Sequence, residues 1–371
     1  MSLTATIIGW GLCGIFLILL IITLSLGRVV PAIPLLLICI LVSPLFGALF
    51  KTQNVKIIMY IVRTVLVLVF LFGFVMLSFI DAIKYPLYKN DQLKANLQRI
   101  YDDKMDKWPV PYETQYVECV GGKAFVITCG PENAPPVLLF HAASMGSWSW
   151  LYNVEELAKD HRVYAVDYIG EPGKSIVTDE KAIPFDTEGL NQMYDDIVAG
   201  LGITQPYDVI GASFGGFIAM NRAMHAPDEV KSVTLLGPMG ITPATSSVNT
   251  KLMAYQLFPL KPFQNNMFHW ALGYDPKVVA ETEDWFWLVL NGVSRKGSPP
   301  NTFTPEQLKE IDIPVLLILG DKDGLVGAPQ TVIRLAENVS DIDIEILSSG
   351  HLIGMEKPVE TNALILKFLR K

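Results

Sequence analysis

The first 80 residues contain no aspartate or glutamate, and only four basic side chains interrupt them. Three runs in this part are almost free of charge, and each reaches the ~20 residues that a helix needs to cross ~30 Å of hydrocarbon. They lack the polar face that a helix on the surface of a soluble core would show. The sequence therefore predicts a membrane region with three transmembrane helices, at about residues 5–26, 31–50 and 57–80.

The segment before the first run, Met1 to Thr4, also lacks a basic side chain. A secretory signal would have a basic start, a shorter apolar run and a cleavage site of small residues. This N-terminus has no basic residue and its apolar runs are longer and more numerous, so no secretory signal is expected. Three spans predict a multi-pass membrane protein whose ends lie on opposite sides. Five basic residues on the side of the large domain, against two or three on the other, slightly favour a cytoplasmic domain and leave the side open. The five are Arg28, Lys84, Lys89, Lys94 and Arg99, and the others are Lys51, Lys56 and Arg63.

In the rest of the chain, by contrast, acidic residues outnumber basic ones. The whole chain has a formal net charge of −8 and the first 80 residues contribute +4, so residues 81–371 carry −12. Phosphate binding needs a basic face. We therefore expect no nucleic-acid partner.

Cysteines and metal-binding patterns are scarce. Two of the four cysteines fall in the predicted spans, and Cys119 and Cys129 flank a hairpin predicted to turn at Gly121–Gly122. A two-residue turn there pairs Cys119 with Ala124, so no disulfide is expected. The chain contains no H-x-H, H-E-x-x-H or C-x-x-C pattern and no phosphate-binding glycine loop. We therefore expect neither a metal nor a cofactor.

After a predicted linker helix in residues 81–111, short apolar runs alternate with helical ones. This alternation predicts a mostly parallel sheet with helices on both faces, over residues 112–371. Residues 240–309 interrupt it, because they contain no strand and are rich in aromatic residues and methionine. Their position between two strands predicts a helical cap over the carboxyl ends of the strands, where such sheets place their sites.

One stretch in this alternation carries a chemical motif. Gly211 to Gly215 has the pattern G-x-S-x-G, after an apolar run and before a helical one. This predicts a strand, a sharp turn and a helix, with Ser213 at the strained apex and its hydroxyl projecting from the sheet. Glycines two residues either side of the serine remove the β-carbons that would collide there.

A serine nucleophile needs a base, and the base needs an orienting acid. Of only five histidines, His351 follows the last predicted strand at its carboxyl end and is the predicted base. Asp321 and Asp323 both follow the preceding strand, and spacing alone does not choose between them. The oxyanion needs backbone donors. One is the N–H of Phe214, and the second is expected from the turn at residues 141–146.

These motifs, in this order, resemble the α/β-hydrolase superfamily over residues 112–371, and serine carboxylesterases within it. The resemblance assigns the family pattern G-x-x-D to Gly320 and Asp323, and thus implies Asp323 as the acid. It also implies the amide of Ala143 as the second oxyanion donor. The family commonly has His-Gly in this turn, whereas this chain has an alanine at position 142.

The sequence therefore predicts a membrane-anchored serine hydrolase that cleaves carboxylic esters through an acyl-enzyme. Ser213 is the nucleophile, His351 the base and Asp323 the acid. The expected partners are a small or lipid-like ester substrate and the lipid bilayer. Amide, thioester, carbon–carbon and acyl-lipid hydrolysis by the same residues stay open, as does a non-catalytic membrane interaction protein on a hydrolase fold.

Overall fold

The computed structural model describes residues 10, 12–21, 29–42, 62, 64–73, 87–180, 182–183, 187–243, 269–270, 273, 275–294 and 301–371. The chain forms two compact units. Met1–Tyr85 with Gln256–Phe258 make up the first unit, and Pro86–Tyr255 with Pro259–Lys371 make up the second.

The described part of the first unit is helical. Residues 12–21, α2 (Val29–Val42) and residues 64–73 have helical backbones. Leu20, Ala32 and Leu35 form a small buried cluster. Among the residues that the structure describes, no helix is long and apolar enough to cross a bilayer. Much of the three predicted spans lies outside those residues, and the spans stay a prediction.

The second unit is built on a nine-stranded sheet, in the order β1-β2-β4-β3-β6-β7-β8-β9, with β5 paired to β2. All pairings from β4 through β9 are parallel, whereas β1, β2 and β5 add antiparallel pairs at one side. The predicted mostly parallel sheet is confirmed. Its strands are β1 (Tyr112–Cys119), β2 (Gly122–Cys129), β3 (Pro136–Phe140), β4 (Arg162–Val166), β5 (Ile176–Val177), β6 (Tyr207–Ala212), β7 (Val230–Leu236), β8 (Val315–Gly320) and β9 (Ile342–Leu347).

The register of the β1–β2 hairpin differs from the prediction. Cys119 pairs with Gly122, so the two turn residues are Val120 and Gly121. The predicted turn at Gly121–Gly122 was therefore wrong by one position. Gly121 adopts φ 83° at the second turn position, where valine would be strained, and this places the turn. All four cysteines are free in the structure.

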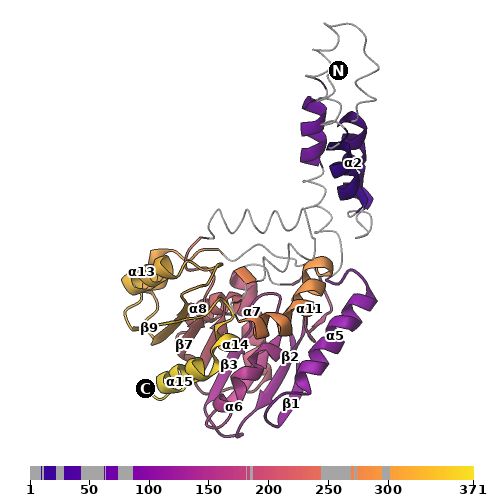
Figure 1. Cartoon of the computed structure of the whole chain (residues 1–371). Helices are drawn as coiled ribbons and strands as arrows, with labels where there is room; N and C mark the ends of the chain where they lie inside the picture. The colour runs from indigo at the N-terminus through magenta and orange to yellow at the C-terminus, as the bar shows by residue number, and fades with distance from the viewer. Residues whose placement is uncertain are drawn as a thin grey trace, which may run out of the picture. The chain divides into compact units, whose positions relative to one another are not determined.

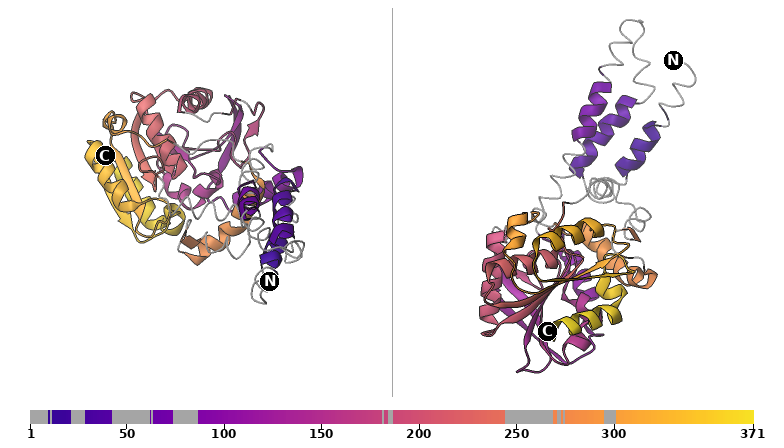
Figure 2. Two further views of the ribbon diagram at one scale, coloured as in Figure 1. Left: turned by 90° about the horizontal axis from the view of Figure 1, so that it is seen from above. Right: turned by 90° about the vertical axis from the view of Figure 1, so that its left-hand side faces the viewer.

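Helices cover both faces of the sheet, as Figures 1 and 2 show. Helices α5, α6, α11, α14 and α15 share one hydrophobic core, and α7, α8 and α13 share the other. The helices are α5 (Asp91–Met105), the 3-10 helix η1 (Ser147–Tyr152), α6 (Val154–Leu157), α7 (Thr187–Gly200), α8 (Phe214–His225), α11 (Pro276–Gly292), α12 (Pro305–Lys309), α13 (Ala328–Asn338), α14 (Ile353–Glu356) and α15 (Pro358–Leu369).

Alternation along β8 separates the two cores. Leu316 and Ile318 point into the core beneath α15, and Leu317 and Leu319 point into the core beneath α8. All six residues of β8 are buried. A strand buried on both faces is a continuous apolar run, which is why this strand was predictable from the sequence.

Two helices that the sequence assigned to a linker and a cap pack on the same face of the sheet. Asn90 caps α5 by accepting a hydrogen bond from the amide of Leu93, and α5 buries Tyr101 in the core that it shares with α11. The segment before α5 also pairs with the end of α11, since the Lys89 amide donates to the Gly292 carbonyl at 2.9 Å. Most of the predicted cap, residues 240–309, lies outside the described residues apart from α11, α12 and short flanking segments.

Candidate active site

Ser213 lies at the tight turn between β6 and α8. Its backbone has φ 52° and ψ −111°, a conformation that L-residues rarely adopt. A β-carbon at Gly211 would lie 2.1 Å from the Gly215 carbonyl oxygen, and one at Gly215 would lie 2.0 Å from the Phe140 carbonyl oxygen. Only glycine fits at these two positions. The strand, turn and helix expected for this stretch, called the elbow below (Gly211–Gly215), are observed.

His351 and Asp323 are joined by a hydrogen bond. His351 Nδ1 lies 2.7 Å from Asp323 Oδ2, and the Asp323 side chain is fully buried. The other oxygen of Asp323 accepts hydrogen bonds from the amides of Leu325 and Val326, at 2.8 and 2.9 Å. A carboxylate that accepts hydrogen bonds on both oxygens in this way is fixed in position beside His351.

Asp321, the alternative acid, lies elsewhere. It is exposed, and its carboxylate lies 3.4 Å from the hydroxyl of Ser348. Spacing alone had left Asp321 and Asp323 open. The structure brings Asp323, and not Asp321, to His351.

The environment of His351 changes its proton affinity in two opposing ways. Burial lowers the pKa of the imidazole, while the charge and hydrogen bond of Asp323, with a smaller contribution from Glu356, raise it by more. The pKa of His351 therefore lies above its ordinary value of 6.5. A base with such a pKa gains affinity for the proton of a hydroxyl but must be deprotonated before it can act.

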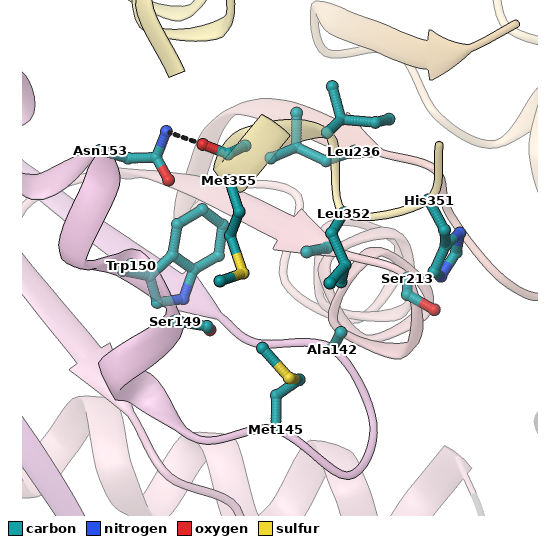
Figure 3. Close-up of a pocket in the computed structure, with 13 residues that line it drawn as sticks. Ala142, Met145, Ser149, Trp150, Asn153, Ser213, Leu236, His351, Leu352 and Met355 are labelled. Atoms are coloured by element: carbon teal, nitrogen blue, oxygen red, sulfur yellow. Dashed lines mark hydrogen bonds between the residues drawn. The ribbon is translucent and has the colours of Figure 1, made fainter. Parts of the chain in front are cut away.

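Ser213 and His351 line the same pocket, and Figure 3 shows the two side chains together at one end of it. The pocket contains about 390 Å³ of empty space, part of it open to solvent. Its wall is mostly apolar, with a few polar side chains at the end away from His351. It is lined by Ala142, Met145, Ser149, Trp150, Asn153, Ala212, Ser213, Leu236, His351, Leu352, Ile353, Gly354 and Met355.

Gly237 is a site residue that sequence reasoning missed. It has φ 54°, and a β-carbon there would lie 3.2 Å from Asp323 Oδ2 and 3.4 Å from His351 Nδ1. The residue before it, Leu236, accepts a hydrogen bond from the Ser213 amide at 2.9 Å. The sequence could have indicated Gly237 by its position, because it directly follows β7, and β7 lies in the sheet between β6 and β8, the strands that precede Ser213 and Asp323.

The predicted oxyanion donors lie on two neighbouring turns. Phe214 begins α8, and Ala143 lies in the turn after β3, where Phe140 pairs with Gly211 of β6. None of the described residues accepts a hydrogen bond from either amide. Ala142 lines the pocket, whereas Ala143 is not part of its wall.

The turn Ala142–Met145, called the Ser144 turn below, closes with a hydrogen bond from the Met145 amide to the Ala142 carbonyl at 3.1 Å. Of the described non-glycine residues only Ser144 and Ser213 have positive φ, at 63° and 52°. The alanine at position 142, where the family commonly has glycine, is therefore not in the left-handed region. The strain in this turn falls on Ser144 instead.

Two residues distant in sequence hold the peptide groups of Ser144. The Ser144 amide donates to the carboxylate of Glu171 at 2.8 Å, and the Ser144 carbonyl accepts from the indole nitrogen of Trp285 at 2.7 Å. Both side chains are buried. Sequence reasoning missed both, although Glu171 lies in a glycine-rich loop after a strand and Trp285 lies in the predicted cap.

His141 is occupied within the same turn. Its Nδ1 lies 2.8 Å from the Ala142 carbonyl, and its ring stacks on Tyr168 with centroids 4.0 Å apart. The Tyr168 hydroxyl donates to the His141 carbonyl at 2.5 Å. This histidine therefore supports the turn, and the histidine beside Ser213 is His351.

Comparison with known proteins identifies relatives of the second unit. The family model for the alpha/beta hydrolase fold matches residues 135–268. "Uncharacterized carboxylesterase nap" of Bacillus subtilis is 30% identical over 292 residues, which cover 72% of this chain and 90% of that protein. The crystal structure of naproxen esterase (carboxylesterase NP) from Bacillus subtilis superposes with a TM-score of 0.65 and 26% identity, covering 74% of this chain and 96% of that chain.

A mammalian protein is also similar. Monoacylglycerol lipase ABHD6 of Mus musculus is 25% identical over 264 residues, covering 64% of this chain and 76% of that protein. The fold, the elbow and these relatives agree with one another, and the prediction of a hydrolase is confirmed. The chain belongs to the α/β-hydrolase family, as a hydrolase similar to carboxylesterases.

Proposed function

We propose that this protein is a serine hydrolase that cleaves carboxylic esters by acyl transfer to Ser213. The observation that carries the proposal is the buried pair of His351 and Asp323, 2.7 Å apart, in the pocket that also holds the strained Ser213. An aspartate in this position keeps the imidazole in one tautomer and stabilises the imidazolium that forms during the reaction.

The reaction proceeds in two halves. Ser213 Oγ attacks the ester carbonyl carbon while His351 takes the hydroxyl proton on Nε2, and the amides of Phe214 and Ala143 bind the oxyanion. The tetrahedral intermediate then collapses, and the leaving alcohol takes the proton from His351. Water attacks the acyl-enzyme with His351 again as the base, which releases the acid and restores Ser213.

The pocket wall supports an ester with an apolar group of moderate size. Met145, Trp150 and Met355 face the space beside Ser213, and methionine side chains adapt to groups of different shape. Amides, thioesters and carbon–carbon bonds need the same three residues, so the scissile bond is decided by the substrate that the pocket accepts.

A panel of p-nitrophenyl esters of graded acyl length tests the proposal. We expect hydrolysis of short and medium esters, with a maximum in kcat/KM where the group fills the pocket. Ser213→Ala is expected to lower kcat by about 10⁶-fold. If the wild-type protein hydrolyses none of these esters above the rate of the Ser213→Ala variant, the proposal of an esterase is wrong.

A lipid-like ester is the second candidate substrate. The apolar pocket supports it, and so does the similarity to a protein named monoacylglycerol lipase. Hydrolysis of a monoacylglycerol in detergent micelles, compared with the ethyl ester of the same acyl chain in the same micelles, separates the two candidates, because both esters release an alcohol of similar basicity. A kcat/KM for the monoacylglycerol that does not exceed that for the ethyl ester favours the small ester, since the contribution of the shared acyl chain cancels.

We also propose that the first 80 residues anchor the enzyme in a membrane with the catalytic unit on the cytoplasmic side. Large apolar side chains in the described helical residues are exposed, among them Ile18, Leu68 and Phe72 at 59%, 59% and 63%. Exposed apolar surface of this kind marks contact with lipid or with another protein. The charge count described above supports the cytoplasmic side.

Fractionation tests the anchor. We expect the full-length protein to stay with the membrane fraction after washing with alkaline carbonate and to be released by detergent. Single cysteines placed at Ser2 and Lys371 are then expected to react with an impermeant maleimide from opposite sides of sealed cells. Recovery of the full-length protein in the carbonate supernatant would contradict the anchor.

A further inference from the structure

One hydrogen-bond donor in the pocket wall has no partner. Trp150 lines the pocket and is only 3% exposed, and its indole Nε1 finds no acceptor among the residues that the structure describes. The hydroxyl of Ser149, the residue before it, donates to the Gly146 carbonyl at 2.8 Å. Figure 3 shows the nitrogen on the side of the ring that faces Ser149 and Met145, two other residues of the pocket wall.

A buried donor without an acceptor is unfavourable, because the group has lost its water and gained nothing in return. Trp148, two residues earlier in the same helix, also has an unpartnered and buried Nε1. Trp148 packs against Trp285 and does not line the pocket. Of these two indoles, only that of Trp150 belongs to the pocket wall as described.

The other residues of the pocket wall indicate what kind of ligand would meet this donor. Beside it are the thioethers of Met145 and Met355 and the aliphatic side chain of Leu236, which bind apolar groups. Asn153 uses its amide nitrogen on the Gly354 carbonyl and on Asn362. Among the described residues of this wall, Trp150 Nε1 is thus the buried side-chain donor without an acceptor, and its neighbours in the wall are mostly apolar.

We propose that Trp150 Nε1 binds a neutral oxygen acceptor, such as an ether or ketone oxygen, on the arm of the ester that occupies this pocket. The proposal rests on the proposed esterase function and narrows its substrate class to esters with an oxygen atom in an otherwise apolar arm. A site built around a hydrogen bond rejects the analogue that lacks the partner, because its own buried polar group is then left unpaired. The indole of Trp150 is in this sense a specificity-determining group.

Oxygen-for-methylene isosteres test the proposal on the full-length protein. The acyl series consists of p-nitrophenyl heptanoate and its 4-oxa, 5-oxa and 6-oxa analogues, each corrected for its rate of alkaline hydrolysis. The alcohol series consists of heptyl acetate and its oxa analogues, followed by acid release. For at least one oxygen position in one series we expect the oxa ester to exceed its methylene isostere in kcat/KM by about 3- to 10-fold, the range for one net hydrogen bond.

Trp150→Phe removes the N–H and keeps an aromatic ring in the wall. Because the ratio of oxa ester to isostere is taken within each variant, any general loss of activity cancels. We expect the ratio to fall to one or below in Trp150→Phe, because the ether oxygen is then buried without a donor. The matched control, Trp148→Phe, removes an equally buried and unpartnered N–H outside the pocket and is expected to keep the wild-type ratio.

The outcomes separate this proposal from the proposed function. If the wild-type enzyme hydrolyses no ester of either series, the esterase function itself fails. If it hydrolyses the esters but shows no oxygen preference at any position, or if Trp150→Phe keeps the preference, the oxygen subsite is overturned and the esterase function stands. A preference that Trp150→Phe abolishes and Trp148→Phe retains establishes the subsite.

Discussion

Two serines with left-handed backbones follow neighbouring strands of the sheet, and they are held in different ways. Ser213 in the elbow has φ 52° and follows β6, and Ser144 has φ 63° in the turn after β3, the strand that pairs with β6. The elbow is held by close backbone contacts of Gly211 and Gly215. The Ser144 turn is held by side chains that lie 27 and 141 residues later in the chain, Glu171 and Trp285.

This difference explains which strained backbone conformations can be predicted from a sequence. Strain held by neighbouring glycines leaves a motif of five residues, and so the elbow was predictable. A strained residue that is held by distant side chains leaves no local pattern, because the residues next to it in the sequence do not have to be of any particular type. Both turns supply a proposed oxyanion donor, so we expect the catalytic rate to depend on both.

Among the residues that support Ser213, Asp323 is expected to have the largest effect. Asp323→Asn should lower kcat by about 10⁴-fold, because His351 loses the group that orients and stabilises its charged form. Asp321→Asn, the matched control on the exposed side of the same loop, should change kcat little. A larger loss in Asp321→Asn than in Asp323→Asn would overturn the assignment of the acid.

The same variant changes the pH dependence in a defined direction. His351 must be neutral to act as the base, so activity rises as pH increases through its pKa, which Asp323 holds above 6.5. Removing the carboxylate charge lowers that pKa. The acid limb of kcat/KM in Asp323→Asn should therefore move to lower pH than in the wild type, and a limb that moves upward would contradict this assignment.

The second largest effect breaks the elbow itself. Gly215→Ala places a β-carbon 2.0 Å from the Phe140 carbonyl oxygen, so backbone must move. We expect the free energy of unfolding in urea to fall by at least about 2 kcal/mol. Gly202→Ala is the control, since Gly202 also has a positive φ but has no atom within 4 Å of the added carbon. Equal losses of unfolding free energy in the two variants would show that the close backbone contacts at Gly215 do not require glycine.

A smaller effect is expected when the Ser144 turn loses its acceptor. Glu171→Ala leaves the Ser144 amide without its partner, and the turn can then shift the Ala143 donor away from the oxyanion. We expect kcat to fall by about 10-fold with little change in KM, a fraction of the effect of removing a donor entirely. Glu171→Gln keeps an oxygen acceptor and should restore most of kcat. If Gln fails to rescue activity while the protein stays folded, Glu171 acts by its charge and not as an acceptor.

The smallest effect tests the strain of Ser144 directly. Glycine adopts positive φ without penalty, so Ser144→Gly relieves strain in the folded state while adding freedom to the unfolded chain. We expect the free energy of unfolding to change by no more than about 0.5 kcal/mol, with activity retained. Ser147→Gly, in the helical backbone of η1, should cost about 1 kcal/mol. A greater loss at Ser144 than at Ser147 would contradict the idea of strain.

Local patterns explain how much of the molecule was predictable. The central strands β3, β6 and β8 are mostly apolar runs because both faces are buried, and the elbow carries its own glycines. The two-residue strand β5 was missed, since Ile176–Val177 pairs with β2 only because the glycine-rich loop returns to it. The hairpin register was missed because it depends on which residue takes φ 83°, and two adjacent glycines both allowed it.

The site was predictable only in part for the same reason. Two aspartates that differ by two positions have the same local pattern, and only the packing of the loop after β8 brings Asp323 to His351. The contacts of Glu171, Trp285 and Gly237 join segments distant in sequence, which spacing cannot reveal. Sequence patterns thus identified the candidate groups, and tertiary contacts decide how they are held.

The most direct test of the account is covalent labelling of Ser213. The wild-type protein, treated with a fluorophosphonate and digested, should carry one phosphonyl group on the peptide that contains Ser213, as detected by mass spectrometry. Ser213→Ala should carry none, and Asp323→Asn should label more slowly because its base is poorly oriented. Labelling that persists in Ser213→Ala, or a wild-type protein that does not label, would contradict the central claim that the elbow presents an activated serine.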